Sequence, residues 1–429
     1  MRKNLLFTLC FFLAVSATAQ SNYGVQFSSL LSDDLSLESA IRLGLENNAE
    51  FLAAKEEIVI AEQRVSEAKF RYLPQFALQG TATWYDADSP MVLPEPGINR
   101  FLPDTDSLHS NHFYGAGITA TQYLYSGGRI NNTLKIAKAN LKQIQSRYET
   151  VKNAVVLDIK KSFANLLYAQ ENVAFTQKLY EQIKNWKFSS NPLTRIRQKS
   201  LVAQLKSSYQ TAQSQLAQAR LAMLVSLNKE LNSPLTISGT LEPITITGDL
   251  PHFQLWATEF RPELKSAIYA LELDNIAIDM ALSKRYPDIL LNASYERVGD
   301  SDLNDQNKQV SLAVRLPIPY TFSQQVNQKK AEQKKSTLRR SAIEDKIHVQ
   351  VASSFEQMLF WQQEATERQE TYKELTKLLE QADANASHSS LESLEARREF
   401  LHMGQSYLEA LRENHIAKAQ LEWAIGKDL

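Results

Sequence analysis

The chain has 429 residues and a nearly balanced charge, with 47 basic and 48 acidic residues. This balance argues against a nucleic-acid-binding protein, because such a domain usually carries a net positive charge. Glycine and proline number 13 each, which favours long uninterrupted elements over many turns. After the N-terminal region, no segment is apolar enough for a transmembrane helix. A membrane-embedded form would therefore have to be a closed β-barrel, because lipid cannot satisfy open backbone edges.

The N-terminus has the pattern of a secretory signal peptide. A basic start precedes an apolar run over residues 5–15, and the small residues Ala17-Thr18-Ala19 follow. The run is shorter than the roughly 20 residues that a membrane-spanning helix needs. We therefore expect residues 1–19 to be removed, so that the mature chain begins at Gln20. The single cysteine, Cys10, lies inside this segment, and we expect neither a lipid anchor nor a disulfide.

The mature chain contains two copies of one unit. Pro74 corresponds to Pro287, 213 positions later, and the stretch before each proline matches without a gap. A second correspondence, of residues 162–168 with 354–360, has an offset of 192. The difference of 21 residues (213 − 192) falls in the proline-rich segment 86–111, which we interpret as a surface loop.

Within each copy we expect the order helix, strand, loop, strand, very long helix, turn and helix. The first copy is assigned to residues 20–232, a linker to 233–260 and the second copy to 261–429. The first copy is predicted to hold a helix at 36–73, strands at 75–85 and 112–125, and long helices at 128–187 and 193–231. The second is predicted to hold a helix at 261–285, strands at 288–297 and 309–317, and long helices at 322–384 and 390–426.

The strand segments alternate between apolar and polar residues with a period of two. Aromatic residues lie toward their ends, which is typical of transmembrane strands, although an ordinary two-sided antiparallel sheet fits the alternation equally well. On the membrane interpretation, the residues facing lipid are Phe76, Leu78, Trp84, Ile118, Leu291, Val310 and Leu312. The residues facing the lumen are Thr81, Thr119, Ser294 and Arg315.

The long helices decide between these interpretations. Residues 128–185 contain no proline and no internal glycine, and their apolar residues recur at spacings of three and four, as in a coiled-coil seam. The C-terminal helix has Leu394, Leu401 and Leu408 at intervals of seven. A helix over 128–185 would be a rod of about 87 Å, which cannot wrap a globular core. Its apolar stripe needs partners in the same chain and in neighbouring chains.

Four strands per chain cannot close a barrel, for which about eight strands are the lower limit. Three chains with four strands each would supply twelve. We therefore predict a mainly α protein whose long coiled-coil helices form an α-helical barrel. Its four β-strands per chain close a 12-stranded transmembrane barrel in a homotrimer.

Motifs for catalysis are absent from the sequence, which has no phosphate-binding loop, no nucleophile elbow and no His-Glu-x-x-His. His109 and His112 lie near two aspartates, but in a proline-rich loop we interpret them as solvated side chains. We expect no enzymatic activity, no cofactor and no metal site.

The chain resembles the TolC family of outer-membrane efflux proteins over essentially the whole mature sequence, and three local stretches, with their order and duplication, carry the resemblance. Leu35–Asn48 is similar to the family's opening segment, Arg71–Pro74 to its helix-to-strand junction, and Gln122–Gly128 to its strand-to-helix junction. The junction residues are Pro74, Gly127, Gly128 and Pro287. The second strand-to-helix junction, at residues 316–322, lacks the double glycine.

The resemblance implies a barrel in the outer membrane of a Gram-negative bacterium, a helical tunnel in the periplasm and an equatorial region near 233–260. It implies the exit duct of a tripartite efflux or type I secretion system. The implied partners are a periplasmic adaptor (a membrane fusion protein) and an inner-membrane transporter. The alternative is a periplasmic coiled-coil adaptor or structural spacer without a pore. An adaptor would normally have one helical hairpin and an interrupting all-β domain, whereas this chain has two hairpins.

Residues 389–396 resemble the family's second tip turn, where two aspartates three positions apart begin the last helix. Here the two positions are Glu392 and Glu395, which share one helical face. In a trimer, the resemblance implies two stacked carboxylate rings that gate the periplasmic mouth. The simpler alternative is that acids in a first helical turn complement the helix dipole. The first tip turn, at residues 189–195, lacks the family's usual Gly-Leu pair.

Overall fold

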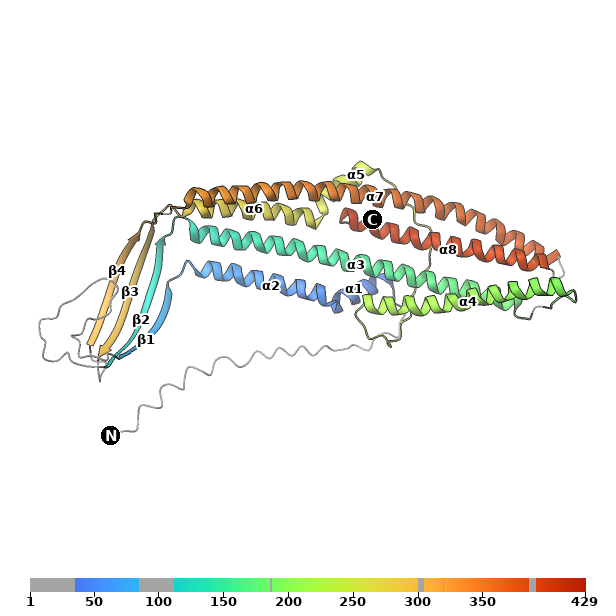
Figure 1. Ribbon diagram of the computed structural model, residues 1–429, viewed down its shortest axis with the longest axis horizontal. Helices are drawn as coiled ribbons and strands as arrows, with labels where there is room; N and C mark the ends of the chain where they lie inside the picture. Colours follow the sequence, from blue (N-terminus) through green and yellow to red (C-terminus); the bar gives the residue numbers. More distant parts are fainter. Residues whose placement is uncertain (1–34, 85–111, 186, 300–304, 319, 386–390) are drawn as a thin grey trace, which may run out of the picture.

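The computed structural model describes residues 35–84, 112–185, 187–299, 305–318, 320–385 and 391–429. This part of the chain is a long rod with a four-stranded sheet at one end and the ends of the helices α3, α4, α7 and α8 at the other (Figure 1). The predicted signal peptide at 1–19 and His109 lie outside the described residues. For His112, the strand is described but the side chain is not.

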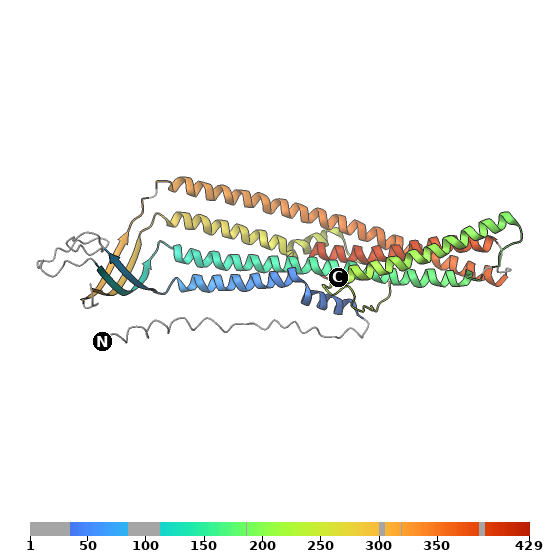
Figure 2. The same cartoon turned by 60° about the horizontal axis from the view of Figure 1, so that its bottom comes forward.

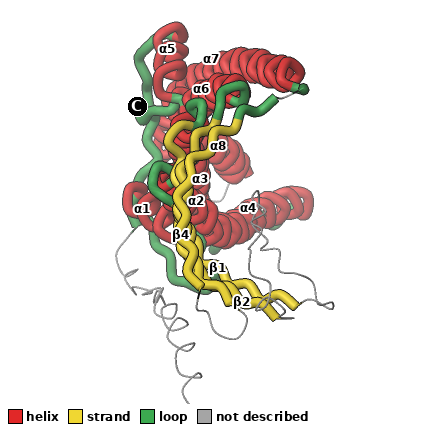
Figure 3. Tube along the Cα trace, turned by 90° about the vertical axis from the view of Figure 1, so that its left-hand side faces the viewer, coloured by secondary structure: helices red, strands yellow, loops and turns green. Residues whose placement is uncertain are grey.

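The sheet is antiparallel, with its strands in the order β1-β2-β3-β4. Figure 3 shows the four strands side by side at the end of the rod nearest the viewer. In the described part of the chain, the edge strands β1 and β4 each have a strand neighbour on one side only. The strands are β1 (Gln75–Trp84), β2 (His112–Tyr125), β3 (Asp288–Gly299) and β4 (Asp305–Arg315).

Eight helices are described, and the two longest, α3 and α7, run most of the length of the rod (Figure 2). They are α1 (Leu37–Asn47), α2 (Ala49–Phe70), α3 (Arg129–Ile183), α4 (Pro192–Ser226), α5 (Leu250–Phe260), α6 (Pro262–Ser283), α7 (Phe322–Asn385) and α8 (Leu391–Ile425).

Beside the sheet, the helices form a single layer in the order α2-α3-α6-α7. Each of them adjoins one strand, so the helix order repeats the strand order β1 to β4. Farther along, α4 takes the place of α2 and α8 takes the place of α6, giving the order α4-α3-α8-α7. Three apolar clusters hold the rod together, one between α3, α4 and α8, one between α5, α7 and α8, and one near the hairpin turns.

The single helix predicted at 36–73 is two helices in the structure. Asn48 between them has extended backbone angles, with φ −69° and ψ 117°. Its side-chain oxygen accepts a hydrogen bond from the backbone N–H of Phe51 at 2.9 Å, which caps the start of α2. Asparagine competes with helix continuation through such local bonds, and a search for apolar periodicity does not register them.

The second copy begins earlier than residue 261. Helix α5 has the same length as α1 and lies 213 positions after it, and α6 stands in the same relation to α2. The helix predicted to end at 231 also ends earlier, at Ser226. Asn228, two residues later, has a φ of 50°, which does not continue a helix. What was expected to be a linker at 233–260 therefore consists of an extended segment followed by α5.

Candidate functional site

The sheet has one apolar and one polar face. Residues directly opposite each other in an antiparallel pair share a face, and the register pairs Leu78 with Ile118 and Leu291 with Leu312. Following the register across the sheet puts seven residues on one face: Phe76, Leu78, Trp84, Ile118, Leu291, Val310 and Leu312. The residues Thr81, Thr119, Ser294 and Arg315 lie on the other.

The apolar face is open in the single chain. The side chains of Phe76, Leu78 and Val310 are 71%, 80% and 76% exposed. Lys308 and Arg297 also lie on this face, but the exposed apolar side chains outnumber them. An exposed apolar surface of this kind marks a region that another phase or molecule covers.

The polar face carries a hydrogen bond that crosses three strands. Gln79 on β1 donates from Nε2 to Oε1 of Glu296 on β3 at 2.7 Å, across Gly117 on the intervening strand β2. Sequence analysis did not identify this contact, because it depends on the register of strands 217 positions apart.

The helix–strand junctions of the two copies pack on each other. Gly127 and Gly128, at the end of β2, have φ values of +59° and +85°. A Cβ on Gly127 would lie 2.7 Å from Cβ of Tyr286 and 2.9 Å from the carbonyl oxygen of Ser283, just before β3 begins. An ion pair between Arg129 and Asp288 joins the same two junctions.

Pro74 and Pro287 occupy equivalent positions directly before β1 and β3. In each case the preceding helix closes with one short turn, in which Leu73 N donates to Phe70 O at 3.0 Å and Tyr286 N to Ser283 O at 3.2 Å. Proline ends the helix here because it has no N–H to continue it.

Glu392 and Glu395 lie at the start of α8, at the end of the rod farthest from the sheet, and both are exposed. Leu394 between them is fully buried. The residues before α8, at 386–390, are outside the described part of the chain.

The turn between α3 and α4, at the same end of the rod, is built by polar caps. Asn191 accepts a hydrogen bond from Leu193 N at 3.0 Å, and Ser189 N donates to Gln198 at 2.8 Å. Leu193 and Ile196 are nevertheless 75% and 65% exposed. The first hairpin therefore presents apolar side chains at its end.

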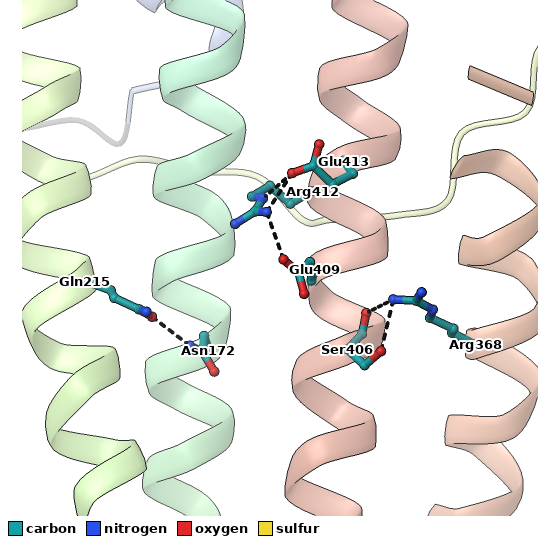
Figure 4. Close-up of polar contacts among 7 residues, drawn as sticks. All are labelled: Asn172, Gln215, Arg368, Ser406, Glu409, Arg412 and Glu413. Atoms are coloured by element: carbon teal, nitrogen blue, oxygen red, sulfur yellow. Dashed lines mark hydrogen bonds and ion pairs between the residues drawn. The ribbon is translucent and has the colours of Figure 1, made fainter. Parts of the chain in front are cut away.

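A polar groove of about 580 Å³ lies between α4 and α8, with α3 at its base. Figure 4 shows Asn172 of α3 facing Gln215 of α4, and Arg368 of α7 reaching Ser406 of α8. The first pair is 3.4 Å apart, and Arg368 donates to the hydroxyl of Ser406 at 2.9 Å. Sequence analysis missed the groove because four helices from both copies build it.

The extended segment 242–246, which we term the strap, crosses α8 and α7. Asn414 binds both backbone groups of Ile244, accepting from its N–H at 2.8 Å and donating to its carbonyl at 3.2 Å. Nε2 of His415 lies 2.9 Å from the carbonyl oxygen of Glu242. Burial lowers the pKa of His415 and nearby Lys418 adds to this, although the bond to Glu242 opposes it.

Among the described residues, no helix is both long enough and apolar enough to cross a membrane. The same residues include no group of three or more His, Cys, Asp or Glu side chains placed to hold a metal ion.

Comparisons with known proteins agree with this architecture. Residues 40–185 match the family model described as outer membrane efflux protein. The search of curated proteins gives no match. Among solved structures, CusC is similar at 18% identity and a TM-score of 0.73, with 92% of each chain covered.

The open state of the Neisseria gonorrhoeae MtrE outer membrane channel also has a TM-score of 0.73, at 17% identity over 91% of this chain and 89% of that one. The outer membrane protein VceC from Vibrio cholerae has a TM-score of 0.68 at 12% identity, covering 91% of this chain and 96% of its own. The shared fold therefore extends over both copies, well beyond the segment that the family model matches.

Proposed function

We propose that this chain belongs to the outer membrane efflux protein family, whose model matches residues 40–185, and that three copies form the exit duct of a tripartite efflux or type I secretion system. The duct is a passive channel in the outer membrane that continues as a helical tunnel into the periplasm. The observation that carries this proposal is the single layer in which β1 to β4 join α2, α3, α6 and α7 in the same order. Copies of such a layer can close a tube of strands and helices together.

Closing the tube in a trimer gives each edge strand and each edge helix a neighbour from the adjacent chain. An open strand edge in lipid would leave backbone groups unsatisfied at several kcal/mol each, and pairing β1 of one chain with β4 of the next removes this cost. The edge helices carry unpartnered apolar side chains that the same contact covers. Ile60 on α2 is 51% exposed, and Leu338 and Val349 on α7 are 65% and 68% exposed.

We assign the apolar face of the sheet to lipid and the polar face to the lumen. A transmembrane barrel alternates apolar and polar side chains in this way when its interior holds water. A periplasmic spacer without a pore would leave Phe76, Leu78 and Val310 exposed to water with no role. In a membrane-embedded duct these side chains contact lipid. Such a duct requires no catalytic group.

The hairpin ends are the surface we assign to a periplasmic adaptor, which would link the duct to an inner-membrane transporter. Leu193 and Ile196 supply exposed apolar area at the first hairpin turn. Glu392 and Glu395 at the start of α8 are assigned to two carboxylate rings that gate the tunnel. Three-fold symmetry would bring equivalent residues toward one axis, and adaptor binding would shift the population toward an open end.

The test is assembly of the full chain extracted from outer membranes in detergent. We expect a trimer by analytical ultracentrifugation and channel conductance in planar bilayers. Leu291→Arg places a charge on the assigned lipid face and should cost about 2–4 kcal/mol near mid-membrane, so trimer yield should fall.

Thr81→Arg is the matched control, because it adds the same charge to the polar face and should assemble nearly as well as the unaltered chain. A folded monomer purified without detergent would refute the proposed trimeric duct. Equal loss of trimer in the two variants would overturn the assignment of faces alone.

A further inference from the structure

Resting on the proposed duct, we infer that Glu296 forms a ring of three carboxylates inside the barrel and makes its outer part selective for cations. This station is separate from the gate at the hairpin ends, since Glu296 belongs to the sheet at the opposite end of the rod.

The position follows from the register. Gln79, Gly117, Glu296 and Asn307 form one row across all four strands, on the face opposite to Leu78 and Leu291. Three-fold symmetry would repeat the row three times around the wall, with the three Glu296 side chains at the same height.

The side chain of Glu296 is held against the wall of the sheet. A Cβ on Gly117 would lie 2.7 Å from Cγ of Glu296 and 2.8 Å from the carbonyl oxygen of Tyr295, so glycine leaves the space in which the glutamate lies. The hydrogen bond of 2.7 Å from Gln79 then fixes Oε1. The side chain of Glu296 is half-buried, so part of it stays accessible on the polar face.

No cation on the polar face lies near this carboxylate among the described strand residues. Arg315 is the one basic residue on this face of the described strands. Its register partner is Asp288, which lies eight residues before Glu296 on β3. Eight residues of strand span about 26 Å, beyond the Debye length of about 8 Å at physiological ionic strength. Arg297 and Lys308 are nearer along the strands, but they lie on the opposite face.

Acidic neighbours on the polar face are also few. Asp305 lies at the start of β4, and Asp288 is ion-paired with Arg129. Glu296 is therefore the one acid within the interior rows of this face in the described strands. Its field should reach across the lumen in dilute salt, where the Debye length is about 30 Å at 0.01 M, and vanish near 1 M, where it is about 3 Å.

The experiment measures single channels of the trimer in planar bilayers in dilute KCl, with hexamminecobalt(III) added on one side at a time. Glu296→Gln keeps an oxygen for Gln79 but removes the charge. We expect it to reduce cation selectivity and to raise several-fold the hexamminecobalt concentration needed for block from the extracellular side. Block from the periplasmic side should be unchanged, and the difference should disappear near 1 M KCl.

Asn307→Lys is the second variant, because it places a cation directly opposite Glu296 in the row. Opposite charges at such positions stabilise a sheet, so this variant should assemble even if Glu296→Gln does not, and it should also weaken extracellular block. Conducting trimers of either variant with unchanged selectivity and block would overturn the inference. Absence of conductance from the unaltered trimer would instead refute the proposed duct.

Discussion

Gly127 and Gly128 are adjacent at the junction of β2 and α3, yet they are constrained differently. Both have positive φ, which costs a residue with a side chain roughly 1–2 kcal/mol. Nothing lies within 4 Å of a Cβ on Gly128, whereas a Cβ on Gly127 would meet Tyr286 and the backbone oxygen of Ser283 below 3.0 Å. The backbone oxygen belongs to the other copy of the repeat, so relief requires the two copies to separate.

Gly127→Ala should therefore destabilise the trimer more than Gly128→Ala. We expect the first variant to dissociate at a clearly lower temperature in detergent, and the second to show only the smaller backbone cost. Thermal dissociation followed on denaturing gels without boiling measures both. If the two variants dissociate at the same temperature, contact between the copies at Gly127 is not what requires glycine.

Individual strand residues show how far sequence reasoning reaches at this scale. The face shared by Phe76, Leu291 and Val310 was predictable, because a period of two fixes alternation whatever the neighbouring strand is. The bond between Gln79 and Glu296 was not, because a shift of one residue in register would separate them. The alternation along one strand determines which face of the sheet a residue lies on. Only the register between strands determines which side chains it contacts.

Among the elements, α3 departs most from the expected pattern. Its second half buries large apolar residues such as Ile159 and Phe163, as a coiled-coil seam predicts. Its first half buries Asn132, Ala139 and Ser146, which are seven residues apart, while larger apolar side chains are only partly covered. A search for large apolar residues overlooks a buried seam of small and polar side chains.

The strap was also beyond prediction, because it has no period of its own and is held by side chains of distant helices. Asn414 and His415 of α8 bind its backbone, and Gln362 of α7 accepts from Ile246 N at 3.0 Å. Since these bonds tie α7 and α8 together near the middle of the rod, the strap should resist separation of the two helices.

His415 should make this attachment sensitive to pH. Burial lowers its pKa in the folded chain, so the unfolded chain takes up a proton first as the pH falls below about 6.5. The stability contributed by neutral His415 is complete above that value and is lost as the pH falls through the folded-state pKa.

His415→Gln should remove that component. We expect the melting temperature of the unaltered trimer to fall more between pH 7.5 and pH 5 than that of the variant, whatever their difference at pH 7.5. Differential scanning calorimetry in detergent at both pH values measures this. Equal falls in the two proteins would show that folding does not lower the pKa of His415.

At the scale of the whole molecule, two copies of one unit form a continuous layer from sheet to hairpin ends. The two proposed charged stations lie at opposite ends of this layer, with Glu296 in the sheet and Glu392 with Glu395 at the start of α8. A solute moving outward would pass the hairpin end first. The two stations should therefore be separable by the side from which a blocking ion is added.

Exchanging the two carboxylates that we assign to the gate tests that assignment. Glu392→Gln combined with Glu395→Gln removes two negative charges per chain, and both side chains are exposed, so packing around Leu394 should be kept. Crowded carboxylates attract cations, and their field weakens at high salt. We expect lower cation selectivity in dilute salt and weaker block by hexamminecobalt(III) added from the periplasmic side, with the trimer intact.

Block by hexamminecobalt(III) added from the extracellular side distinguishes a local effect at the proposed gate from a general effect of the changed net charge. In the double variant, block from the extracellular side should stay as in the unaltered channel, because Glu296 is unchanged. If periplasmic block and selectivity also stay the same, Glu392 and Glu395 serve as ordinary acids at a helix start, where they complement the dipole of α8. The constriction would then have to be set by packing between the coiled helices rather than by charge.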